Sequence, residues 1–134
     1  MNLSVENLAQ VFAVLKPDLS VQQVVNEPSL YADLDKNYAG FKDHVLIAVH
    51  DFTQDWPTWE CHPAGDEIVV LLAGHCEFIL KTDSGDQSLL LDQQGSYVVV
   101  PKGIWHTAKI ATSAKVLFIT PGENTQNAEQ PESR

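Results

Sequence analysis

The 134-residue sequence predicts an all-β domain, either a sandwich or a barrel, with a short helix near its N-terminus. Between Phe41 and Thr120, short runs rich in Val, Ile, Leu and Phe alternate with turn residues, and no helical pattern separates them. Their spacing is typical of a fold with about eight strands. The apolar share of 44%, with 19% charged residues, is that of a globular chain. Its length suits one domain of roughly 100–150 residues.

The main domain is expected over residues 41–122. Strands are expected at 44–50, 58–62, 67–72, 75–81, 87–91, 96–100, 105–110 and 114–120. Turn residues punctuate them, as in Asp83-Ser84-Gly85-Asp86 and Pro101-Lys102-Gly103. The absence of helices between the strands favours a β-sandwich or barrel.

The two ends of the chain have other patterns. Residues 4–15 predict an amphipathic helix with Ser4 as its cap and Pro17 soon after its end. Apolar residues fall there at helical spacing: Leu8, Val11, Phe12 and Leu15. With the segment up to residue 40, this helix is expected to wrap the main domain. Residues 123–134 hold no large apolar residue and predict a disordered polar tail.

The charge of the chain disfavours several partners. Eight Lys and Arg against 18 Asp and Glu give a formal net charge of −10, which disfavours nucleic acid and anionic membranes. No apolar run approaches the ~20 residues of a membrane span. The first residues also lack the basic stretch of a signal peptide. These two observations lead us to expect a cytoplasmic protein. Two cysteines are too few for a disulfide framework.

Four residues are candidate metal ligands: Glu60, His62, Glu67 and His106. Glu60 and His62 alternate along a predicted strand and therefore share a face. Glu67 follows a Pro-Ala-Gly-Asp turn that can fold it back beside them. Two imidazoles with a carboxylate suit Fe(II) and other divalent ions of the first transition row.

The sequence around these residues resembles the two motifs of the cupin family. GSYVVVPKGIWH matches the second motif through Gly95, Pro101, Gly103 and His106. ECHPAGDEIVVLLAG matches most of the first motif through His62, Glu67 and Gly74. The resemblance covers residues 54–120. It implies a double-stranded β-helix, or jelly-roll barrel, that holds a divalent metal at the His and Glu positions.

Three positions depart from the cupin pattern. Glu60 occupies the place of the first motif histidine, Gln54 that of a usual Gly, and Ile110 that of a frequent Asn. Glu60 is either a fourth metal ligand, a residue that orients His62 or a bound water, or the mark of a cupin without metal. If it is not a ligand, it is a candidate general base and the one candidate catalytic residue. The sequence does not choose among iron, manganese, nickel and zinc.

The resemblance implies a metal-binding protein with a small organic ligand in its barrel, and two classes of function. One is a metal-dependent enzyme, a dioxygenase or an isomerase; the other is a non-catalytic binding, sensing or storage module. Arg134 is the single arginine, so a neutral or carboxylate ligand is expected rather than a phosphorylated one. The resemblance also implies a homodimer.

The remaining histidines, cysteines and tryptophans match no motif position. His44 and His50 share a strand face but are expected outside the site, and His75 is expected to be exposed. The cysteines are expected to be inert strand residues, and the tryptophans to pack the barrel, with one able to line its mouth. These residues are Cys61, Cys76, Trp56, Trp59 and Trp105.

Overall fold

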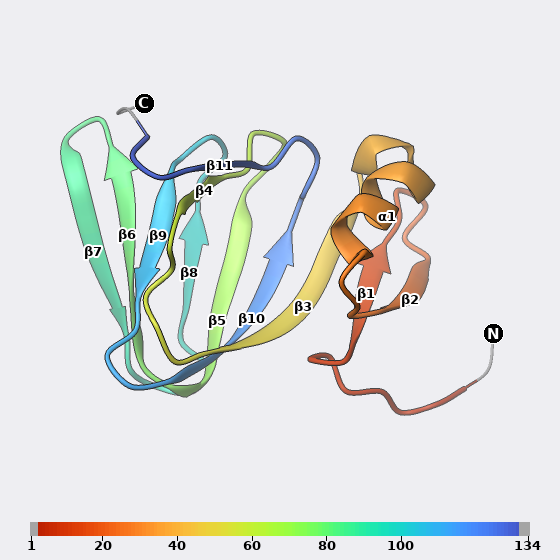
Figure 1. Cartoon of the computed structure of the whole chain (residues 1–134), viewed down its shortest axis with the longest axis horizontal. Coiled ribbons are helices and arrows are strands. Elements are labelled where there is room, and N and C mark those ends of the chain that lie inside the picture. Colours follow the sequence, from red (N-terminus) through yellow and green to blue (C-terminus); the bar gives the residue numbers. More distant parts are fainter. Residues whose placement is uncertain (1–2, 132–134) are drawn as a thin grey trace.

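Two antiparallel sheets form most of the computed structural model, which describes residues 3–131 (Figure 1). Sheet A has the strand order β2-β1-β3-β10-β5-β8, and sheet B has the order β11-β4-β9-β6-β7. The strands of sheet A are β1 (Val11–Leu15), β2 (Val21–Val25), β3 (Val45–Phe52), β5 (Glu67–Gly74), β8 (Tyr97–Val100) and β10 (Ala114–Thr120). Those of sheet B are β4 (Trp59–Cys61), β6 (Cys76–Thr82), β7 (Gly85–Leu91), β9 (His106–Lys109) and β11 (Gln126–Ala128).

The strands predicted between residues 44 and 120 are confirmed, each as one strand from β3 to β10. Side chains alternate along them, so every second residue enters the core between the sheets. On sheet A this core includes Val69 and Leu71 of β5 and Val116 of β10, and on sheet B it includes Phe78 of β6. The result is a β-barrel of the jelly-roll type, with one short helix beside it, as the sequence predicts.

That helix lies at a different place from the predicted one. Val11–Leu15 forms β1, between β2 and β3, so the prediction of a helix over 4–15 is wrong. Helical and strand spacing both fit this apolar segment, and the two neighbouring strands decide the outcome by satisfying its backbone groups. Phe12 and Val14 are buried in alternation. Within residues 3–131 the α-helix is α1 (Leu30–Asn37), followed by the 3₁₀ turn η1 (Ala39–Phe41).

Helix α1 covers a second, smaller core on sheet A. Leu30 and Leu34 of α1 pack there with Phe12, Leu46 and Ala48. Figure 1 shows α1, β1 and β2 together at one side of the barrel, joined to it by the long strand β3. Sheet A is therefore shared by two hydrophobic cores, one facing sheet B and one under α1.

The chain past residue 122 also differs from its prediction. Gln126–Ala128 forms β11, which pairs with β4 and places Asn127 opposite Glu60. The predicted disordered tail is therefore wrong for these three residues, and its last residues, 132–134, lie outside the described part. Low apolar content does not prevent a strand here, because β4 offers an open edge with backbone partners.

Two further expectations concern cysteines and membranes. Cys61 and Cys76 are both buried strand residues, and burial raises the pKa of the Cys76 thiol to about 11. The Cys76 thiol therefore stays protonated at neutral pH and is a poor nucleophile. Among the described residues, no helix is sufficiently long and apolar to cross a bilayer.

Candidate metal centre

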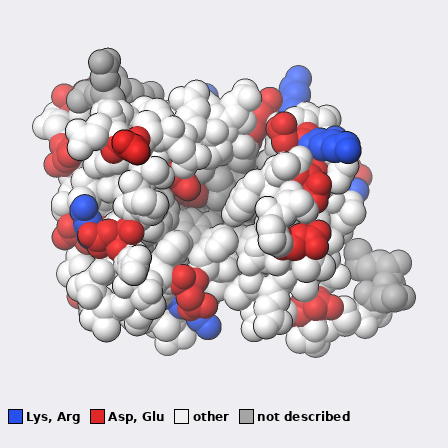
Figure 2. Space-filling view, in the orientation of Figure 1, with Lys and Arg blue, Asp and Glu red and all other residues white. Residues whose placement is uncertain are grey.

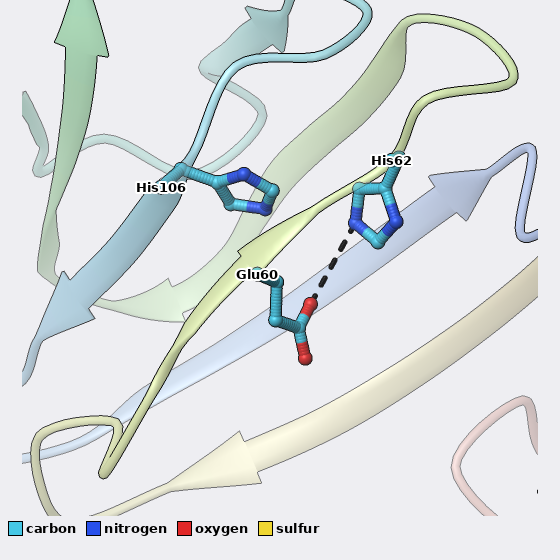
Figure 3. Close-up of side chains that lie close together, drawn as sticks. All are labelled: Glu60, His62 and His106. Carbon is cyan, nitrogen blue, oxygen red and sulfur yellow. Dashed lines mark ion pairs between the residues drawn. The ribbon is translucent and has the colours of Figure 1, made fainter. Parts of the chain in front are cut away.

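The strand pairing brings the four predicted site residues to one end of the barrel interior. Glu60 lies on β4 directly opposite His106 at the start of β9. His62 follows β4, and Glu67 begins β5 on the other sheet. Figure 3 shows Glu60, His62 and His106 close together, with the Glu60 carboxylate directed toward the His62 ring. Residues 46 positions apart in the chain thus meet because β4 and β9 are neighbours.

Hydrogen bonds between loops fix the backbone of the two histidines. Gly103 adopts a φ of 77°, which favours glycine, in the turn that leads to His106. Its N–H donates to the carbonyl of His62 at 3.1 Å. The neighbouring Lys102 N–H donates to Asp66 Oδ1 at 2.8 Å. The turns of the two motifs therefore hold each other, and with them the spacing of the imidazoles.

Glu67 lies between the two imidazoles. Its Oε2 is 3.3 Å from His62 Nε2, and its Oε1 is 3.1 Å from His106 Nε2. Glu60 Oε2 is 3.6 Å from His62 Nε2, the contact dashed in Figure 3. Possible ligand atoms of Glu60, His62 and His106 all lie within 4.8 Å of one another. Glu67 and both histidines are buried, whereas Glu60 is 33% exposed at the edge of the group.

Hydrogen bonds at the far side of each ring set the tautomers. His106 Nδ1 lies 3.1 Å from the Ile104 carbonyl, which can only accept, so Nδ1 carries the proton. His62 Nδ1 lies 2.9 Å from Thr125 Oγ1, and that hydroxyl donates to the Gly122 carbonyl at 3.0 Å. The Thr125 oxygen is therefore free to accept from His62 Nδ1–H. In the neutral rings both Nε2 atoms then point bare lone pairs into the site.

The atoms that converge in the site are all acceptors in this state. Within residues 3–131, no hydrogen bond satisfies His62 Nε2, His106 Nε2 or Glu67 Oε1, although all three are buried. Thr120 Oγ1 donates to Glu67 Oε2 at 2.6 Å and so orients the carboxylate. Buried lone pairs that face one another are costly unless a cation lies among them. The donor set of two imidazoles and carboxylates fits a divalent metal ion.

The electrostatics of the protein alone also favour a positive charge here. Burial opposes ionisation of Glu67, but its contacts with His106 and His62 outweigh burial and hold its pKa at about 2. Burial disfavours the charged form of His106, yet the Glu67 carboxylate raises the pKa of that imidazole. Burial and the Glu67 charge raise the pKa of Glu60. In the metal-free protein, a protonated His106 therefore supplies the positive charge that a metal ion would otherwise supply.

Two site residues escaped the sequence analysis, Thr125 and Thr120. Neither has a periodic or motif signal, because each reaches the site through pairing of distant segments. The other aromatic and histidine residues divide between the barrel and its surface. Trp56 packs 6.1 Å from the His106 ring between centroids, whereas Trp59 lies under Lys81 at 4.5 Å. His75 is exposed, as expected.

Comparisons with known proteins find similarity in fold. No family model matches the sequence, and a search of curated proteins finds no match. Among solved structures, a cupin-2 domain protein from Shewanella frigidimarina matches at 23% identity and a TM-score of 0.49, over 57% of this chain and 70% of that one. Hydroquinone 1,2-dioxygenase from Sphingomonas sp. matches at 18% sequence identity and a TM-score of 0.49. This match covers 57% of this chain and 58% of that enzyme.

A third similar structure is the hydroxypropylphosphonic acid epoxidase of S. wedmorenis, at 21% identity and a TM-score of 0.48. The match covers 57% of this chain but only 43% of the epoxidase, so this chain spans less than half of that enzyme. The fold and the buried His–Glu group define a jelly-roll barrel with a possible metal site, in agreement with the cupin resemblance of the sequence.

Proposed function

We propose that this chain binds one divalent transition-metal ion through His62, Glu67 and His106, with Glu60 at the open edge of the site. The observation that carries this proposal is the set of three buried atoms, two Nε2 and Glu67 Oε1, without hydrogen bonds in the described chain. The Ile104 carbonyl and Thr125 hydroxyl hold both rings in the tautomer that a metal requires. Iron, manganese, nickel and zinc all accept such nitrogen and oxygen ligands.

Glu60 has a position suited to proton transfer beside the metal. It is the one partly exposed carboxylate of the group, and its pKa is raised by burial and by the Glu67 charge. A carboxylate with a raised pKa accepts a proton more readily at neutral pH. We therefore propose Glu60 as a general base that faces the bound organic ligand, and as a fourth metal ligand only when no other ligand is bound.

The proposed organic ligand is a small neutral or carboxylate molecule. Lys81, one of the few cations of the barrel, is engaged with Asp86 at 3.3 Å and with the Trp59 ring. No arginine lies within residues 3–131 to clamp a phosphate. A bound divalent ion supplies Lewis-acid polarisation of a ligand oxygen or activation of O₂, which suits an isomerase or a dioxygenase. The second candidate is a binding or storage module, which a four-ligand site with few open positions favours.

Metal analysis with three variants tests this proposal. We expect about one metal ion per chain in the purified protein and after reconstitution, and loss of that ion in His106→Ala. The control is His75→Ala, an exposed histidine that should leave the metal content unchanged. Retention in Glu60→Ala shows that the metal does not need Glu60 as a ligand, and loss assigns Glu60 to the metal. A wild-type protein that binds no divalent ion tightly would overturn the proposal.

Turnover separates the two functional candidates. O₂ uptake by the Fe(II)-loaded protein with a small hydroxylated acid indicates a dioxygenase, and conversion without O₂ indicates an isomerase. Glu60→Gln should reduce either activity while the bound metal remains. Tight ligand binding without conversion supports the binding or storage module instead.

A further inference from the structure

On the inner face of sheet A, one part lies between the core that faces sheet B and the core under α1. Along β3, Ala48, His50 and Phe52 alternate and so point to the same face of the sheet. Ala48 belongs to the core under α1, and Phe52 packs against the core of the barrel. His50 lies between them and is only partly buried. It is therefore at the boundary where neither α1 nor sheet B covers the face completely.

The surface of the molecule is hollowed at this boundary. Figure 2 shows a groove between the barrel and the part built by α1, β1 and β2, and β3 crosses between the two parts in the same view of Figure 1. The face that β3 turns toward this groove carries an aromatic group around His50. The Phe52 ring lies 6.1 Å and the Phe118 ring 5.8 Å from the imidazole, between centroids.

Polar groups from two elements, α1 and β3, meet at the groove. The Tyr31 hydroxyl, from α1, lies 3.5 Å from His50 Nε2. Although 60% of Tyr31 is exposed, its hydroxyl end lies against the protein, and burial together with the negative charge of Glu60 raises its pKa. The Phe118 ring beside His50 also packs against the Trp56 ring, with 5.9 Å between centroids. The Trp56 ring in turn lies 6.1 Å from the His106 ring between centroids, so the aromatic group around His50 extends to the candidate metal centre.

The Tyr31–His50 contact leaves hydrogen-bonding capacity on both groups. A separation of 3.5 Å is long for an O–H···N bond, whose usual length is below about 3.2 Å. A phenol can donate one hydrogen bond and accept another, and a neutral imidazole offers one donor and one acceptor. A hydroxyl group placed beside the pair can thus donate to one partner and accept from the other. The neighbouring phenylalanine rings offer a flat apolar contact for the body of the same molecule.

We propose that this groove is the ligand-binding site of the protein and that Tyr31 and His50 select ligands with a hydroxyl at the end remote from the metal. The inference rests on the proposed metal function. Its ligand class is a small planar molecule with a carboxylate or other oxygen group at the metal end and a hydroxyl at the other end. Tyr31 comes from a helix outside the barrel, so α1 acts as a wall of the site.

Pairs of ligands that differ by one hydroxyl test this specificity. The probes are benzoate, phenylacetate and phenylpropionate, each compared with its para-hydroxy derivative, because the series varies the reach from metal to hydroxyl. Zn(II)-loaded, isotopically labelled protein is titrated with each probe, and amide NMR shifts give the binding site and Kd. We expect saturable shifts at Tyr31, His50 and Glu60. At least one para-hydroxy compound should bind more tightly than its partner.

Variants separate selectivity from general weakening. Tyr31→Phe should raise the Kd of the para-hydroxy compound about tenfold, as loss of one hydrogen bond predicts, and leave that of the compound without the hydroxyl unchanged. His50→Phe should do the same. The matched controls are Tyr97→Phe and His75→Phe, which change exposed residues elsewhere on the surface and should bind both compounds normally.

The outcomes separate a failure of the groove proposal from a failure of the metal proposal. Zn(II) binding is measured first for every variant and should match wild type, because Tyr31 and His50 are not metal ligands. If wild type binds no Zn(II), the metal proposal fails, and titration of the metal-free protein then decides the groove on the same hydroxyl selectivity. The groove proposal is overturned if no compound gives saturable shifts there, or if Tyr31→Phe weakens both members of a pair equally.

Discussion

Thr125 holds a ligand candidate of the proposed metal centre in place without being a candidate ligand itself. Its hydroxyl accepts from His62 Nδ1 and donates to the Gly122 carbonyl, so it fixes both the tautomer and the orientation of the imidazole. Partners of this kind commonly contribute about 10- to 100-fold to metal affinity. Thr120 has the matching role for Glu67.

At this scale we expect Thr125→Val to weaken Zn(II) binding about 10-fold or more, because the valine cannot accept the His62 proton. Isothermal titration calorimetry measures the change. Thr125→Ser should restore most of the affinity, since it restores the hydroxyl. Thr112→Val, at an exposed position, is the control. Equal affinities for Thr125→Val and wild type would show that His62 needs no such partner.

Because of Glu67, we expect the free energy of unfolding of the metal-free protein to fall at acidic pH. Its pKa is about 2 in the folded chain against an ordinary value of 4.5, so its contribution to folding is complete above pH 4.5 and is lost as pH falls toward 2. The loss is on the order of 3 kcal/mol. Urea unfolding between these pH values measures it. Glu67→Gln should remove much of this slope, and parallel curves for the two proteins would contradict the assignment.

At the scale of elements, Gly74 marks a close approach between the end of β5 and the start of β10. It ends β5 with a φ of 76°, and a Cβ at this position would lie 2.2 Å from the Ser113 carbonyl oxygen. This glycine occupies the last position of the first cupin-like motif. Its requirement is therefore steric, from the close approach of β5 and β10, and not chemical.

Gly74→Ala should lower the free energy of unfolding by about 2–4 kcal/mol, from backbone strain and overpacking together. Gly85→Ala is the matched variant, because Gly85 also has a positive φ but its added Cβ meets nothing within 4 Å. The Gly85 variant should lose less stability than the Gly74 variant. Chemical denaturation compares the two variants. Equal losses of stability would mean that backbone strain from the positive φ, and not the overlap of the added Cβ with Ser113, causes the whole effect.

The elements also show where sequence patterns decide structure. The strands from β3 to β10 were predictable because each combines alternation with turn residues at both ends, and local and tertiary preferences agree there. In Val11–Leu15 they disagree, since the same apolar residues fit a helix or a strand. Hydrogen bonds to β2 and β3 choose the strand. For β11 the sequence carries no apolar pattern, and this strand forms only because it pairs with the edge of β4.

At the scale of the whole molecule, the outer face of sheet A is unusual for a face in contact with water. Its central strands alternate core residues with outward Ile, Val and Leu, whereas a solvated antiparallel sheet normally alternates with polar residues. Tyr97 is 63% and Val99 45% exposed on this face. The outward side chains of β5 and β10 include Ile68, Val70, Leu117 and Ile119, and Lys115 lies at the end of this row on β10. A face of this kind favours association through the sheet.

We therefore expect a homodimer through the outer face of sheet A, in keeping with the resemblance to cupins. Light scattering on the wild-type protein should give twice the chain mass at micromolar concentration. Leu117→Lys should give the monomer mass with the far-UV circular dichroism of wild type, because it charges the face without entering the core. Val25→Lys, on the exposed edge strand β2, is the control and should remain dimeric. A monomeric wild type would contradict this expectation.

The sequence by itself determined the β-rich domain and the identity of the four residues that meet in the site. Alternation, turn residues and motif spacing are local properties, so they can be recognised without knowing which strands pair. The tertiary structure decided the strand β1, the helix α1 beside the barrel, and the contacts that Thr125, Tyr31 and His50 make. Each of these depends on contacts between segments far apart in the chain, whose free energy no local pattern expresses.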